Sequence, residues 1–106
     1  HWNPKGWAAL TIALRRGGFQ LVNRYVVHAE NLNSMHIAQQ NALLHDVILV
    51  LAADEAGVGG EWKRPLGIDQ RDSETFCHDC GTLLGWLLAT NATEPTITAE
   101  WARLLA

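Results

Sequence analysis

The chain has 106 residues, of which 48% are apolar, and a formal net charge of −3. This length allows one domain with one hydrophobic core, and the apolar content excludes a disordered tail. The negative charge argues against a free-standing nucleic-acid binder, because such a protein needs a concentrated positive surface. Two cysteines do not make a disulfide framework, and no apolar run reaches transmembrane length. We therefore expect a cytoplasmic protein without a signal peptide or membrane contact.

A helix is predicted at about residues 4–16. Asn3 suits the capping position before it, because an asparagine side chain can accept a free backbone N–H of the first turn. Trp7, Leu10 and Leu14 recur at helical spacing, so we expect them to form the buried face of this helix.

Two strands are predicted next, at about residues 19–28 and 45–53. The first alternates in polarity, which predicts two faces. One face contains Phe19, Leu21, Asn23, Tyr25 and Val27, and the other contains Gln20, Val22, Arg24, Val26 and His28. We expect this strand to be most buried near Val26 and Val27.

The second strand contains an unbroken apolar run, residues 47–53. A strand with one covered face alternates apolar and polar residues, whereas a continuous run predicts cover on both faces. Because two strands and a few helices supply little cover, we expect either a piece of a larger sheet or a sheet that an oligomeric partner completes.

The remainder of the chain is predicted to be a loop followed by two helices. Trp62, in the loop at 57–71, is expected to anchor on an apolar surface. Helices are predicted at 73–89, capped by Ser73, and at 98–106, capped by Thr98. Gly81 and Gly85 would let another element approach the first of these helices closely.

The predicted fold is thus α/β: a small sheet of two antiparallel strands packed by helices at 4–16, 73–89 and 98–106. The chain forms a single domain or domain fragment. It divides into an α/β core at 1–56, the loop at 57–71 and a helical part at 72–106.

The connection between the two strands is rich in neutral amides. Asparagine and glutamine can read an adenine edge with two hydrogen bonds, so this stretch is a candidate for a substrate-facing surface. The candidates are Glu30, Asn31, Asn33, His36, Gln39 and Gln40. The alternative is an ordinary solvated connection.

A second candidate site is Cys77-His78-Asp79-Cys80. Two thiolates three residues apart can hold one zinc ion, with His78 as a third ligand. A tetrahedral site needs two more ligands than Cys77 and Cys80 supply, and the chain has no second cysteine pair. The alternatives are thiol redox chemistry and two buried, apolar helix cysteines. We find no self-contained catalytic constellation in the sequence.

The first half of the chain resembles a known enzyme family. The similarity lies in Trp7-Ala-Ala-Leu10, in Ala13-Leu14-Arg15-Arg16-Gly17-Gly18-Phe19-Gln20-Leu21-Val22, and in Tyr25-Val26-Val27-His28-Ala29-Glu30. Together with the apolar strand from His45, this pattern resembles the late part of adenine-specific DNA methylases. These are class I S-adenosylmethionine-dependent methyltransferases, and the pattern is closest to their zinc-ribbon subgroup. The resemblance covers about residues 2–53.

The resemblance implies two antiparallel strands at one end of a larger sheet, with DNA as the partner of the parent protein. The Asp/Asn-Pro-Pro-aromatic motif of those enzymes is absent, since Asn3-Pro4-Lys5-Gly6 does not match it. A proper glycine-rich cofactor turn is absent too. The resemblance therefore implies a structural, DNA-facing part of a DNA adenine methyltransferase. In that part we expect no catalytic residue and no cofactor, while S-adenosylmethionine serves the parent enzyme.

Two other functions remain open from the sequence. One is a small stand-alone α/β domain that forms a homo-oligomer and acts as a binding or interaction module. The other is a small zinc-binding module built on Cys77 and Cys80.

Overall fold

The computed structural model describes residues 3–28, 45–53 and 61–105. In chain order its elements are α1 (Pro4–Arg16), β1 (Phe19–His28), β2 (His45–Ala53), α3 (Ser73–Ala89) and α4 (Glu94–Leu105). The two strands pair antiparallel and form one two-stranded sheet. The predicted α/β class and the bounds of both strands are confirmed.

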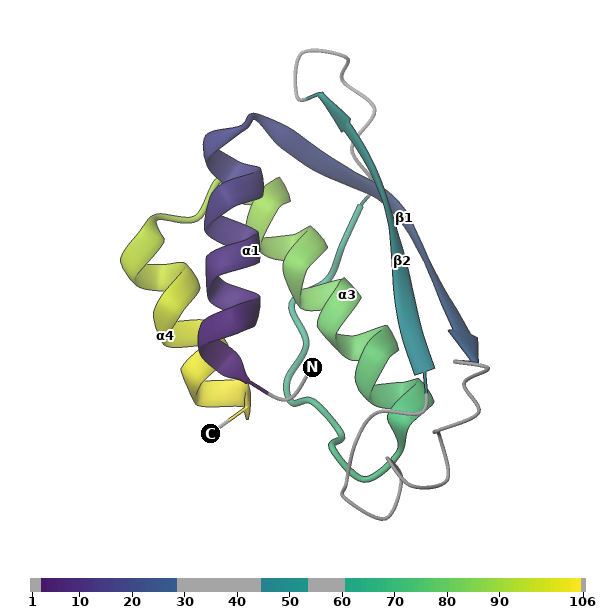
Figure 1. Cartoon of the computed structure of the whole chain (residues 1–106). Coiled ribbons are helices and arrows are strands. Elements are labelled where there is room, and N and C mark those ends of the chain that lie inside the picture. The colour runs from purple at the N-terminus through teal and green to yellow at the C-terminus, as the bar shows by residue number, and fades with distance from the viewer. Residues whose placement is uncertain (1–2, 29–44, 54–60, 106) are drawn as a thin grey trace.

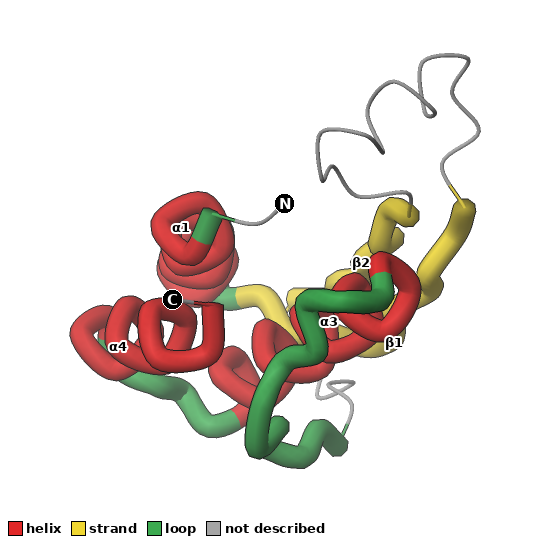
Figure 2. The backbone as a smooth tube through the Cα atoms, turned by 90° about the horizontal axis from the view of Figure 1, so that it is seen from below, coloured by secondary structure: helices red, strands yellow, loops and turns green. Residues whose placement is uncertain are grey.

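Helix α3 occupies the centre of the molecule. It lies between the sheet and α1, and α1 and α4 lie side by side (Figures 1 and 2). A helix that is apolar almost all round belongs in a core rather than on a surface. The buried apolar side chains of α3 are Phe76, Cys77, Cys80, Leu83, Leu84, Leu87 and Leu88.

The sheet contains an irregularity that changes which side chains face α3. The pairing runs from Phe19 opposite Ala53 to His28 opposite His45, but the register shifts between Leu21 and Asn23. Such a bulge inserts one unpaired residue and reverses the alternation beyond it.

The bulge corrects the predicted faces of β1. Leu21 lies opposite Leu51 and is fully buried, on the same side of the sheet as Arg24 and Val26. It does not share a face with Tyr25. The expectation that burial peaks at the far end of the strand is also wrong, because Val27 is 39% exposed.

Helices α1 and α4 are held together by stacked indole rings and a buried hydrogen bond. The ring centroids of Trp7 and Trp101 are 5.0 Å apart, and the rings are inclined by 16°. The Nε1 of Trp101 donates to the Oγ1 of buried Thr11 at 3.0 Å. This contact rotates the buried face of α1 away from the predicted one, so Leu10 is 41% exposed while Leu14 is half-buried.

The first capping prediction is confirmed and the second is wrong. The side chain of Asn3 accepts the N–H of Lys5 at 2.9 Å, at the start of α1. At the start of α3 the cap is Asp72 rather than Ser73. Its carboxylate accepts the N–H of Glu74 at 3.2 Å, and a carboxylate also interacts favourably with the positive end of the helix.

The last helix begins earlier than the predicted range of 98–106. Its first residue is Glu94, and the hydroxyl of Thr93 accepts a backbone N–H of the first turn. Pro95 is compatible with that turn because its missing N–H has no helical partner there. Thr98 therefore lies inside the helix and is not its cap.

Segment 61–72 is fixed to α4 by an ion-pair network. Arg64 contacts Glu100 at 2.6 Å, and Arg103 contacts the other oxygen of the same carboxylate at 2.7 Å. Burial tends to raise the pKa of Glu100, but the hydrogen bonds from Arg103 and Arg64 outweigh this effect and lower it.

Among the described residues, no helix combines the length and the apolar character needed to span a membrane.

Candidate functional site

The most unusual surface of the molecule is the side of the sheet that faces away from α3. We call it the outer sheet face. The register places six side chains on it: Asn23, Tyr25 and Val27 of β1, and Asp46, Ile48 and Val50 of β2. Four of the six are apolar and all are exposed, with Tyr25 at 53% and Ile48 at 50%.

The opposite side of β2 is only partly covered. Val47, Leu49 and Leu51 pack against the core from that side, yet each remains half-buried. No residue of β2 is fully buried, although the strand is apolar from residue 47 to residue 53. Within the described part of one chain, the cover on both faces that the apolar run predicts is therefore absent.

The two free edges of the sheet differ. On the side of β1, the indole Nε1 of Trp62 donates to the Leu21 carbonyl oxygen at 2.9 Å, next to the bulge. Bulges and charged side chains hinder pairing with another strand, and β1 has both, since Arg24 follows the bulge. β2 has no bulge of its own, and its acidic residue, Asp46, lies near its start. The strand contains no proline or lysine, and no described strand pairs with its free edge.

The predicted anchoring of Trp62 is confirmed. Its ring is half-buried against α3, directly over Gly85, where a Cβ atom would lie 2.7 Å from the indole. The guanidinium of Arg24 lies 5.1 Å from the centre of the same ring. Arg24 in turn passes over Gly81, so both glycines permit the close approach that the sequence predicts.

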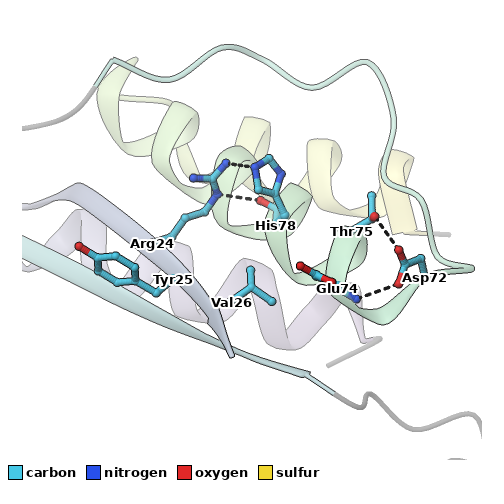
Figure 3. Close-up of a pocket in the computed structure, with 7 residues that line it drawn as sticks. All are labelled: Arg24, Tyr25, Val26, Asp72, Glu74, Thr75 and His78. Atoms are coloured by element: carbon cyan, nitrogen blue, oxygen red, sulfur yellow. Dashed lines mark hydrogen bonds between the residues drawn. The ribbon is translucent and has the colours of Figure 1, made fainter. Parts of the chain in front are cut away.

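A hollow of about 610 Å³ lies beside this cluster, between β1 and the first turns of α3. Its lining consists of Arg24, Tyr25, Val26, Asp72, Glu74, Thr75 and His78 (Figure 3). Arg24 points toward His78 and donates to its carbonyl oxygen at 3.0 Å and to its Nε2 at 2.5 Å. These two bonds fix the Arg24 side chain against α3.

Two charged side chains of the hollow, Arg24 and Asp72, are hydrogen-bonded to neutral groups of α3. The Asp72 carboxylate accepts hydrogen bonds from Glu74 and Thr75 at the start of α3. Burial lowers the pKa of Arg24, while the negative charge of Asp79 opposes that effect. The hollow is thus a polar junction between β1 and α3, in which the Arg24 and Asp72 side chains are both engaged in hydrogen bonds.

The Cys77 and Cys80 thiols lie in the core, with 2% and 0% of their surface exposed. The Cys77 thiol donates to the carbonyl oxygen of His45 at 3.4 Å. Burial raises the pKa of both thiols, most strongly for Cys80. His78 lies on a different side of α3, where its ring contacts Arg24.

Within the described residues, Cys77 and Cys80 have no neighbouring side chains that could complete a zinc site. Among residues 3–28, 45–53 and 61–105, no three histidine, cysteine or acidic side chains gather at one point. Raised thiol pKa values also work against metal binding, because thiolate is the form that binds. The buried, apolar alternative fits these contacts best, and zinc binding stays a prediction.

The six candidate substrate-facing residues of the amide-rich connection lie outside the described residues. They are Glu30, Asn31, Asn33, His36, Gln39 and Gln40. Their role in facing DNA stays a prediction.

No family model matches the chain, and neither the curated proteins nor the solved structures contain a match. The resemblance to adenine-specific DNA methylases is thus neither supported nor contradicted by comparison.

Only the contribution of β2 to the outer sheet face could be predicted from the sequence. The apolar run in β2 indicated that this strand needs more cover than one chain provides. Tyr25 and Val27 were assigned to the same face as Leu21, and Val27 was expected to be buried, because no local motif marks the bulge in β1. The contact between Arg24 and His78 had no sequence signal either.

Proposed function

We propose that the chain is a protein–protein interaction module that binds another polypeptide on its outer sheet face and along the free edge of β2. One observation carries this proposal: β2, which is apolar without a break from residue 47 to residue 53, leaves one face exposed and, among the described residues, one edge unpaired. Soluble proteins seldom expose contiguous apolar surface of this kind unless it binds a partner.

The free energy available from burying the exposed side chains of the outer sheet face fits a reversible interaction. Complete burial of an exposed valine or isoleucine side chain contributes about 1.5–3 kcal/mol. Tyr25, Val27, Ile48 and Val50 are each about half or two-fifths exposed. Their complete burial therefore contributes on the order of 1 kcal/mol each, before any backbone hydrogen bonds along the edge. Micromolar affinity requires about 8 kcal/mol, so the edge must contribute as well.

Peptide selection tests the proposal without knowledge of the natural partner. A random peptide library is selected on the wild-type chain and counter-selected on Tyr25→Lys/Ile48→Lys, two exposed substitutions on paired strands. We expect extended apolar peptides that bind the wild type at least tenfold more tightly than the variant. A matched control, Thr82→Lys on α3, should bind them like the wild type. A library that yields no peptide able to separate wild type from the double variant contradicts the proposal.

The DNA adenine methyltransferase hypothesis is a second candidate. It is favoured by the antiparallel pair itself, because the resemblance implies such a pair at the end of a larger sheet. In that case the remaining strands of the parent enzyme would lie against β2. The test is the longer coding sequence: an Asp/Asn-Pro-Pro-aromatic motif upstream would support this candidate. A coding sequence that begins at this chain would contradict it.

A further inference from the structure

We infer that the polypeptide bound along β2 is a second copy of this chain, with the two β2 strands paired antiparallel about a two-fold axis at Leu49. The inference rests on the proposed function, since it names the partner of the same surface. The result would be a continuous four-stranded sheet in the order β1-β2-β2-β1.

The asymmetry of the two edges indicates where a strand can be added. The edge of β1 is interrupted by the bulge after Leu21, and its carbonyl at that point already accepts the indole N–H of Trp62. The edge of β2 presents nine consecutive residues without a bulge of its own, a proline or a lysine. Strand addition is therefore expected at β2 and not at β1.

Symmetry then fixes the arrangement of the two copies. Two identical strands that pair antiparallel at their edges are related by a two-fold axis normal to the sheet. Both α3 helices consequently lie on the same side, and the two outer sheet faces join into one. Opposite residues share a face in an antiparallel pair, so the strand cannot slip by one residue.

The sequence of β2 matches itself under this symmetry. With the axis at Leu49, all nine residues of each strand are paired, which is the longest ladder that two copies can form. Ile48 then lies opposite Val50 of the second copy on the outer side, and Val47 lies opposite its Leu51 on the side of α3. Asp46 meets Ala52, so the ladder places no like charges opposite each other.

A second copy also adds a neighbour to the side chains of both faces of β2. Ile48 and Val50 are exposed on one face of β2, and Val47, Leu49 and Leu51 are half-buried on the other. A neighbour along the edge contacts the side chains of both faces at once, whereas a partner bound on the outer sheet face alone would leave the second set half-buried.

The interface is small, which predicts a reversible dimer. A nine-residue ladder is roughly 30 Å long, and a sheet with its side chains is about 10 Å thick. Each copy would therefore bury roughly 300 Å², well below the ~800 Å² per partner of a typical stable complex. We expect association that follows protein concentration and is incomplete in dilute solution.

Sedimentation velocity over a wide concentration range tests the inference, with two double variants that differ at one residue. Ile48→Lys/Val50→Lys places lysine opposite lysine twice across the axis. Ile48→Lys/Val50→Glu places lysine opposite glutamate twice. Both variants change only exposed side chains, and circular dichroism checks that both are folded. We expect the first to weaken dimerisation at least tenfold more than the second, because opposite charges attract and like charges repel across strands.

Oxidative cross-linking checks the register separately. A mixture of Ile48→Cys and Val50→Cys chains should form a disulfide-linked dimer, because directly opposite residues lie within disulfide reach. Ile48→Cys alone should not, because its two copies would lie diagonally, roughly 7–8 Å apart.

The outcomes separate the two proposals. A wild type that stays monomeric at every concentration, yet still binds selected peptides on the outer sheet face, overturns the second copy and leaves the interaction module intact. Equal loss of dimerisation in both lysine variants overturns the edge pairing, because it indicates that the outer faces pack on each other. A monomer that selects no peptide overturns both proposals.

Discussion

Replacement of Gly85 by alanine tests the packing of segment 61–72 against α3. A Cβ atom at this position would lie 2.7 Å from the Trp62 ring and 2.8 Å from a methyl carbon of Leu21. Both neighbours are confined, since Leu21 is fully buried and the indole of Trp62 is hydrogen-bonded to its carbonyl. One of them must move, and overpacking of this kind costs about 1–3 kcal/mol.

Two further contributions enter the expected change in the free energy of unfolding. Displacement of Trp62 would lose its hydrogen bond, which contributes about 0.5–1.5 kcal/mol. Alanine stabilises a helix interior by about 1 kcal/mol relative to glycine. The net expectation for Gly85→Ala is a loss of about 1–3 kcal/mol in the free energy of unfolding. For a domain of about 100 residues this corresponds to a fall in Tm of roughly 4–24 °C.

Urea denaturation followed by circular dichroism and tryptophan fluorescence measures this change. Gly81→Ala, one turn earlier on α3, is the matched control. Its Cβ would meet the side chain of Arg24, which is less buried than Leu21 and can move toward solvent at the expense of its bonds to His78, so we expect a smaller loss. If Gly85→Ala is as stable as the wild type, Trp62 does not lie against Gly85 as described.

Three further predictions concern the core and its ion pairs. Thr11→Val should destabilise the fold by about 1–3 kcal/mol in urea denaturation, because it leaves the Trp101 indole N–H buried without an acceptor, while Thr11→Ser should retain most of the stability. Cys77 and Cys80 should not react with a thiol reagent at pH 8 until the protein unfolds, because their raised pKa values and burial suppress thiolate; rapid labelling of the native protein would contradict this. The lowered pKa of Glu100 means that its stabilising effect is complete above about pH 5 and is lost as the pH falls through the folded-state pKa. Wild type should therefore lose more stability than Glu100→Gln between pH 5 and pH 3, and parallel curves for the two proteins would refute the role of the ion pairs.

The features that were predicted correctly depend on residues that are close together in the sequence. The asparagine cap of α1, both strands and the close approach to Gly81 and Gly85 follow from local chemistry and were confirmed. Residue periodicity is a property of a single element, so it can be read before the element packs.

The failures concern positions where tertiary contacts decide. The bulge after Leu21 moves that side chain to the face of α3, and nothing in the local pattern marks it. Thr11 is buried because the indole of Trp101, far along the chain, needs an acceptor. The need of the apolar run for more cover than two strands supply was predicted, whereas the identity of the exposed side chains on β1 depends on the bulge.

The pairing of α1 with α4 has a consequence for how the chain folds as it is synthesised. Thr11 and Trp101 are 90 residues apart in sequence, and the ring of Trp7 stacks on the same indole. A ribosome adds roughly 5–20 residues per second, so the first helix waits roughly 5–20 s for its partner. During that interval Trp7 and Thr11 lack their partner on α4, although β1 and α3, which also contact α1, are synthesised earlier. The nascent chain is therefore vulnerable to misassembly until α4 emerges.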